Sequence, residues 1–103
     1  MMVPFEPRAE ATVSVAASAV TNNVRFNDTS AFPGVPYLRV VNAGSVVAFV
    51  AFGGETVEAS ASTSVPIRPD SEMILRPGGS SYMAAVTAAG TATVYATPGY
   101  GGI

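Results

Sequence analysis

The amino-acid sequence predicts an all-β protein: an antiparallel two-sheet β-sandwich of about seven or eight short strands, of which the jelly roll is one form. Val, Ile and Thr together make up 27 of the 103 residues, whereas Leu occurs only twice. β-Branched side chains suit the pleated, half-buried surface of a strand. Apolar and polar residues also alternate with a period of two in several segments, which is the periodicity of strands.

Five longer segments are the main strand candidates. Four of them alternate, which predicts strands with one buried face: Ala11–Ala17, Tyr37–Val41, Ser81–Thr87 and Thr91–Thr97. The fifth, Val46–Phe52, is apolar on both faces, which predicts a strand that is covered on both sides. Shorter strands are expected at Val24–Phe26, Val57–Ala61, Ser64–Ile67 and Glu72–Arg76.

Turn signals separate these segments and define the ends of the domain. The runs Asn42-Ala43-Gly44-Ser45 and Ala88-Ala89-Gly90-Thr91 each place Gly third, where a turn needs a positive φ. Proline-containing stretches flank the strands, and Pro98 lacks the N–H that a central strand would donate. We therefore expect an N-terminal arm at residues 1–9, a sandwich domain at residues 10–97 and a C-terminal arm at residues 98–103.

The absent residue types exclude most catalytic chemistry. The chain contains no His, Cys, Lys or Trp. Without His or Cys it can build neither a Ser–His–Asp or Cys–His nucleophile system nor an ordinary zinc site. Without Lys it can form no Schiff base, and without Cys it can form no disulfide framework. The sequence therefore predicts a protein that is not an enzyme and that binds no cofactor and no metal.

The carboxylates are the remaining candidates for catalysis or metal binding. Glu55 and Glu58 follow a Gly-Gly turn, and Asp70 and Glu72 lie at another turn. Glycoside cleavage needs two carboxylates across a cleft, and these residues fit solvated turns better. A calcium site built from Asp28 with Glu55, Glu58 and Asp70 would have oxygen ligands, but no calcium-loop motif is present.

The charge pattern points to a covered surface. Only 12% of the residues are charged, and the formal net charge is −2. This balance favours neither nucleic acid nor an anionic membrane as a partner. The charge-free stretches 40–54 and 77–103 are too short or too interrupted for a membrane helix, and the N-terminus does not resemble a cleaved signal. Large contiguous apolar patches are rare on monomers and mark interaction surfaces, so we interpret this apolar, charge-poor surface as one that a partner or another copy covers.

Three segments carry a resemblance to a known family. They are Leu38–Gly53, with Arg39-Val40-Val41-Asn42-Ala43-Gly44; Ile67–Glu72, reading Ile-Arg-Pro-Asp-Ser-Glu; and Gly90–Gly101, with Ala96-Thr97-Pro98-Gly99-Tyr100-Gly101. Together they resemble small tailed-bacteriophage head decoration, or capsid cement, proteins. Tyr100 departs from the pattern, which has an acidic residue there, so a charge-based role of this end is in doubt.

The resemblance implies a structural virion protein on the capsid surface, made in the cytoplasm of a bacterial host. It implies two partners, the major capsid protein and further copies of the chain, with a trimer favoured. The expected interface residues are arginines and aromatics together with residues of the arms: Phe5, Arg8, Phe32, Tyr37, Arg39, Pro98, Tyr100 and Ile103. Two alternatives stay open: a head–tail joining or tail structural protein, and a carbohydrate-binding or adhesin-like module with exposed tyrosines in a row.

Overall fold

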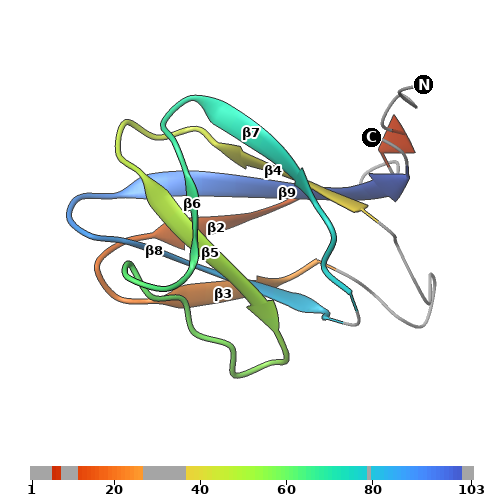
Figure 1. Ribbon diagram of the computed structural model, residues 1–103, viewed down its shortest axis with the longest axis horizontal. Coiled ribbons are helices and arrows are strands. Elements are labelled where there is room, and N and C mark those ends of the chain that lie inside the picture. The colour runs from red at the N-terminus through yellow and green to blue at the C-terminus, as the bar shows by residue number, and fades with distance from the viewer. Residues whose placement is uncertain (1–5, 8–11, 27–36, 79, 101–103) are drawn as a thin grey trace.

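The computed structural model describes residues 6–7, 12–26, 37–78 and 80–100, and these residues form a two-layer β-sandwich (Figure 1). The predicted fold class is confirmed. The described residues contain nine strands and no helix. The strands are β1 (Glu6–Pro7), β2 (Val13–Ala17), β3 (Asn22–Arg25), β4 (Tyr37–Asn42), β5 (Ala48–Gly53), β6 (Val65–Ile67), β7 (Ser71–Leu75), β8 (Tyr82–Thr87) and β9 (Ala92–Tyr100).

The strand order is that of a jelly roll. Sheet A has the order β1-β9-β4-β7, with β2 beside β1 on the same edge of β9, and sheet B has the order β3-β8-β5-β6. Every pairing is antiparallel. The first half of the chain pairs with the second half in reverse, β2 with β9, β3 with β8, β4 with β7 and β5 with β6. The chain is therefore one long hairpin wrapped into two sheets, the jelly-roll form of the sandwich.

The core lies between the two sheets and follows the predicted alternation. In β4, Leu38 and Val40 are fully buried, while Arg39 between them is exposed. In β9, Val94 and Ala96 are buried and Tyr95 between them is exposed. Each fully buried Val or Leu side chain stabilises the fold by about 1.5–3 kcal/mol relative to exposure. Alternation therefore fixes which face of each strand turns inward.

The strand that is buried on both faces is β8, whereas the sequence predicted this for Val46–Phe52. Met83–Thr87 of β8 are all buried, but β5 keeps half-buried residues on its outer face. The reason is the connection between β5 and β6, residues 54–64, which returns across the outer face of sheet B. The side chain of Asn23 donates to the backbone oxygen of Glu55 at 2.9 Å, and Asn23 lies opposite Ala84 in the sheet. This connection therefore covers Ala84 and fills the outer side of β8.

One predicted strand is absent, because this connection replaces it. The segment Val57–Ala61 forms no strand in the structure. Its backbone bonds to side chains instead: the N–H of Ala59 donates to Oγ1 of Thr21 at 2.9 Å, and the N–H of Ser60 donates to Oγ of Ser64. The apolar residues that suggested a strand serve to cover sheet B.

The last strand extends three residues beyond its predicted end, to Tyr100. Pro98 lies inside the strand, although it has no N–H to donate. On one edge of β9 the partner changes at this point: pairing with β2 reaches Ala96, and pairing with β1 begins at Gly99. The missing donor falls at the gap between two partners, so β9 continues past Pro98.

The two predicted glycine turns pack against each other, but only one of them needs a positive φ. Gly90 has a φ of +82°, as expected. No positive φ is found at Gly44, where the prediction was wrong about the cause. A Cβ at Gly44 would lie 2.5 Å from the Cβ of Ala92, so glycine is required there by close approach.

Asn42 connects the two sheets at this end of the sandwich. It ends β4 of sheet A and is fully buried. Its Nδ2 donates to the backbone oxygens of Val46 at 2.8 Å and of Ile67 at 2.9 Å, and its Oδ1 accepts from the N–H of Gly44 at 2.9 Å. One side chain therefore shapes the β4–β5 turn and joins it to β6 of sheet B.

We expect Asn42→Ala to lower the free energy of unfolding by about 3 kcal/mol, because it leaves buried backbone groups without partners. Urea denaturation measures this loss. The matched control is Asn23→Ala, whose amide bonds an exposed part of the chain, and it should cost less than about 1.5 kcal/mol. Equal losses for the two variants would contradict a special role for Asn42.

We expect Gly44→Ala to destabilise the fold by about 1–3 kcal/mol, because the added methyl group overlaps Ala92. Gly54→Ala is the matched control, since a Cβ at Gly54 meets nothing within 4 Å. Thermal unfolding of the two variants side by side checks this. Equal thermal unfolding midpoints for Gly44→Ala and Gly54→Ala would contradict this, because they would show that the turn at Gly44 can move away from Ala92 without loss of stability.

Candidate interaction surface

The outer face of sheet A is the broadest regular surface that the strand register defines. Four neighbouring strands contribute the residues that alternate with the core positions. We call this surface the sheet A face; its residues are Ser14, Ala16, Tyr37, Arg39, Val41, Glu72, Ile74, Thr93, Tyr95 and Thr97. All of them are exposed or half-buried.

The register arranges this face in rows that cross the strands. One row runs Ser14, Tyr95, Val41 and Glu72, from β2 through β9 and β4 to β7. Tyr95 stands near the middle of the face and is 41% exposed, one of the largest exposed hydrophobic side chains in the described part of the chain. A partner that covers this face therefore meets a tyrosine first, surrounded by small and hydroxyl-bearing side chains.

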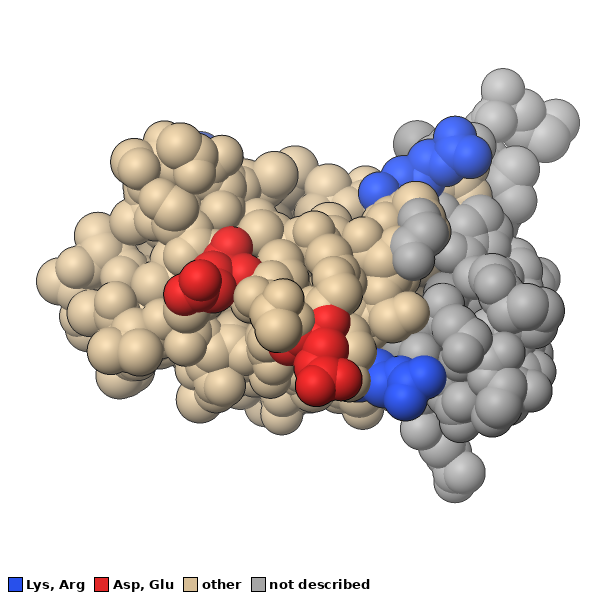
Figure 2. Space-filling view, turned by 90° about the horizontal axis from the view of Figure 1, so that it is seen from below, with Lys and Arg blue, Asp and Glu red and all other residues tan. Residues whose placement is uncertain are grey.

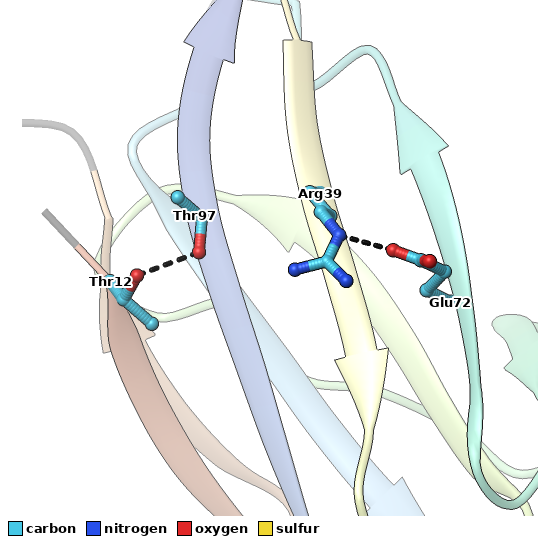
Figure 3. A network of polar contacts seen from close by, with 4 residues as sticks. All are labelled: Thr12, Arg39, Glu72 and Thr97. Atoms are coloured by element: carbon cyan, nitrogen blue, oxygen red, sulfur yellow. Dashed lines mark hydrogen bonds and ion pairs between the residues drawn. The ribbon is translucent and has the colours of Figure 1, made fainter. Parts of the chain in front are cut away.

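Two polar contacts cross the strands of this face (Figure 3). Oγ1 of Thr12 and Oγ1 of Thr97 share a hydrogen bond of 2.7 Å between β9 and the residue before β2. Arg39 of β4 forms an ion pair with Glu72 of β7. Both partners of this pair are about half exposed, so it adds little to stability. Its main effect is to balance the two charges of the face against each other.

The predicted interface residues lie in different parts of the structure. Tyr37 and Arg39 lie on the sheet A face, side by side on β4. Pro98 lies within β9 and is fully buried, so its side chain is not exposed to a partner in this structure. The backbone of Tyr100 pairs with Glu6. The remaining four lie outside the described residues: Phe5, Arg8, Phe32 and Ile103.

Tyr95 was not among the interface residues expected from the sequence, although it is exposed on the sheet A face. The signal was present, because alternation in Thr91–Thr97 already placed Tyr95 opposite the small residues that became core. The row of tyrosines expected of a sugar-binding module is not formed by the described side chains. Tyr82 lies on β8 of sheet B, whereas Tyr37 and Tyr95 lie on sheet A.

The carboxylates do not gather into a reactive site. Glu55 and Glu58 lie in the connection that covers sheet B, and Asp70 lies at the turn before β7 with a φ of +54°. Among the described residues, no group of three or more acidic side chains could hold a metal ion. An open hollow of about 450 Å³ beside Gly53 contains Arg25, Glu55 and Tyr82. It offers a single carboxylate, so it lacks the pair that glycoside cleavage uses.

The described residues include no helix that is long and apolar enough to cross a membrane. Comparisons of the chain with protein families, with curated proteins and with solved structures find no match.

We expect the ion pair of the face to contribute little to folding. The double variant Arg39→Gln/Glu72→Gln should change the free energy of unfolding by less than about 1 kcal/mol, because the pair is half exposed and screened by solvent. Chemical denaturation in low and high salt measures it. A loss that exceeds this value and disappears in high salt would show a stronger structural role for the pair.

Proposed function

We propose that this chain is a structural protein of a tailed-bacteriophage head, which binds the outside of the capsid shell through its sheet A face. In this role it acts as a cement between neighbouring copies of the major capsid protein. The observation that carries the proposal is the sheet A face itself, four strands wide, whose two charged side chains pair with each other.

The chemistry of the face suits contact with another protein. Interface centres are depleted in Lys and Glu and enriched in Tyr and Arg. The sheet A face has Tyr95 and Tyr37, one Arg and no Lys, and its single Glu is already neutralised. Hydroxyl groups of Thr and Ser can exchange hydrogen bonds with water for bonds with a partner. Covering this face therefore removes no unpaired charge from water.

The surface as a whole also carries few charges. Figure 2 shows a side of the molecule on which acidic and basic side chains form a few separate groups in an otherwise uncharged surface. With 12 charged residues, 7 acidic and 5 basic, the chain has little to repel a neighbouring protein. This distribution agrees with a protein that is packed among others in a shell.

The resemblance noted above falls partly on the same sheet. Its three segments include most of β4, all of β5, the turn that leads into β7, and all of β9. β4 and β9 are neighbouring strands of sheet A and supply much of the sheet A face, whereas β5 belongs to sheet B. A rigid sandwich with this face needs no catalytic group to stabilise a capsid.

Copy number in purified virions tests the proposal and separates it from its rivals. A capsid cement is expected in hundreds of copies per particle. A head–tail joining or tail protein is expected in about 6 to 12 copies, in line with closed ring symmetry. Quantitative gel densitometry against the major capsid protein measures this ratio. Absence of the chain from particles would refute the proposal.

A surface variant tests the face directly. We expect Tyr95→Asp to reduce decoration of capsids that lack the protein by at least about tenfold, because it places an unpaired charge in the contact. Val20→Asp is the matched control: Val20 is 75% exposed in the β2–β3 turn, away from the sheet A face. Co-sedimentation of each purified variant with capsids measures binding. Equal binding by the two variants would rule out the sheet A face as the docking surface.

A further inference from the structure

The edge of sheet A at β7 is open. In the described part of the chain β7 pairs with β4 on one side only, and it is the last strand of its sheet. In Figure 1 β7 lies at the upper side of the sandwich, above β4. The outer edge of such a strand carries N–H and C=O groups without partners, which can pair with a strand of another chain.

The side chains of β7 protect this edge weakly. Its five residues, Ser71 to Leu75, contain no Pro or Lys, and their single charged residue, Glu72, is paired with Arg39 on the outer face of the sheet. The edge strand of sheet B on the same side, β6, has only three residues and contains Pro66. The edge strand at the opposite side of sheet A, β2, has core-facing residues that are already buried, with Val15 at 3% exposure.

Met73 is a core-facing residue that is only partly covered at this edge. It lies opposite Val40, which is fully buried, so its side chain is on the core side of the sheet. It is nevertheless 39% exposed, because nothing in the described part of the chain covers the outer edge of β7. A further strand beside β7 would cover Met73 and complete the core at this side.

The sequence around β7 is complementary to itself. When two antiparallel copies of the strand pair, all five residues find a partner only if Met73 lies opposite Met73. In this register Glu72 lies opposite Ile74, and Ser71 lies opposite Leu75. The flanking Asp70 lies opposite Arg76 at both ends, and neither residue forms an ion pair within the described part of the chain. Opposite charges that face each other across strands are stabilising.

Other symmetric registers are worse. Centring the pair on Glu72 places two like charges directly opposite each other, which is destabilising. Centring it on Ile74 places Glu72, which is already paired with Arg39, opposite Arg76. This register pairs only three strand residues of each copy, Met73 to Leu75, and leaves Ser71 opposite Pro77. Registers centred between two residues would place a core-facing side chain opposite an outward-facing one, which a continuous sheet does not allow.

We propose that two copies of this chain associate through β7, antiparallel and centred on Met73. The contact joins the two A sheets into one continuous sheet, in the order β2-β9-β4-β7-β7-β4-β9-β2. The two-fold axis is perpendicular to this sheet, so both sheet A faces lie on the same side. Two linked faces bind a common surface more tightly than either one does alone. The association does not depend on the proposed function, because two copies of the chain are expected to pair in solution without any capsid.

Disulfide trapping tests the register. The chain has no Cys, so a single introduced Cys can react only with its copy. Directly opposite residues in an antiparallel pair have Cα atoms about 4.5–5.5 Å apart, within the range of about 4.4–6.8 Å that a disulfide spans. Met73→Cys should therefore form a covalent dimer under mild oxidation. Ile74→Cys is the matched control, because its two copies would be displaced by two residues, about 7 Å along the strand, which is too far.

Sedimentation velocity tests the association without a crosslink. We expect the unmodified chain to show a concentration-dependent dimer, and Met73→Lys to bind its own copy at least about tenfold more weakly, equivalent to about 1.4 kcal/mol. Val20→Lys makes the same type of change at an exposed site on the other side of the sandwich and should leave the dimer intact. Circular dichroism of each variant confirms that it is folded.

The outcomes separate the possibilities. A Met73→Cys dimer together with a monomeric Ile74→Cys supports the proposal. A disulfide in Ile74→Cys alone, a monomeric unmodified chain, or a trimer that Met73→Lys does not weaken would each overturn it. Because these measurements use purified protein, a failure to find the chain in virions would refute the proposed function and leave the β7 contact standing.

Discussion

The arrangement of the two sheets depends on the hydrogen bonds of one buried side chain, Asn42. The core between the sheets is apolar and rich in Val and Ala, and apolar contacts have no preferred direction, so they define the relative position of the two sheets only weakly. The amide of Asn42 has a fixed donor and acceptor pattern, and it bonds to the turn after β4 and to Ile67 of β6 at once. A buried amide without these partners is costly, so only one relative position satisfies it. The close packing of Gly44 on Ala92 then extends this constraint to β9.

The alternation of apolar and polar residues predicted most of the strands, but it could not predict how distant segments pair. Period-two alternation identified β4, β8 and β9, because one face of each strand meets the same core along its length. The prediction of a strand at Val57–Ala61 was wrong, because this segment covers the face of a sheet. A segment that packs on a sheet and a strand inside a sheet can have the same apolar composition. The predicted end of the last strand before Pro98 was also wrong. A missing N–H interrupts a strand only where a neighbouring strand would accept a hydrogen bond from it. The change of partner from β2 to β1 is a property of distant segments.

The candidate site likewise has a part that could be predicted from local sequence and a part that depends on strand pairing. Alternation in Tyr37–Val41 correctly placed Tyr37 and Arg39 on the face opposite Leu38 and Val40. Their role as interface residues stays a prediction. Which other residues share that face depends on the order of the strands, and a jelly roll places neighbours in a sheet far apart in sequence. Glu72 lies 33 residues from Arg39 and still pairs with it. The edge at β7 could not be read from the sequence, because it depends on which of the described strands pair with β7, and only β4 does.

The low charge of the chain has different consequences for a face and for an edge. On the sheet A face, the pairing of Arg39 with Glu72 means that a partner can cover both groups without separating opposite charges. Around β7, the same pairing occupies Glu72, the acidic residue nearest the centre of the strand, so in the proposed dimer Asp70 and Arg76 would set the register. A protein with an ordinary density of surface charge would oppose both contacts through like charges. Arg39 and Glu72 balance each other on the face, and in the proposed dimer Asp70 and Arg76 would balance each other at the edge.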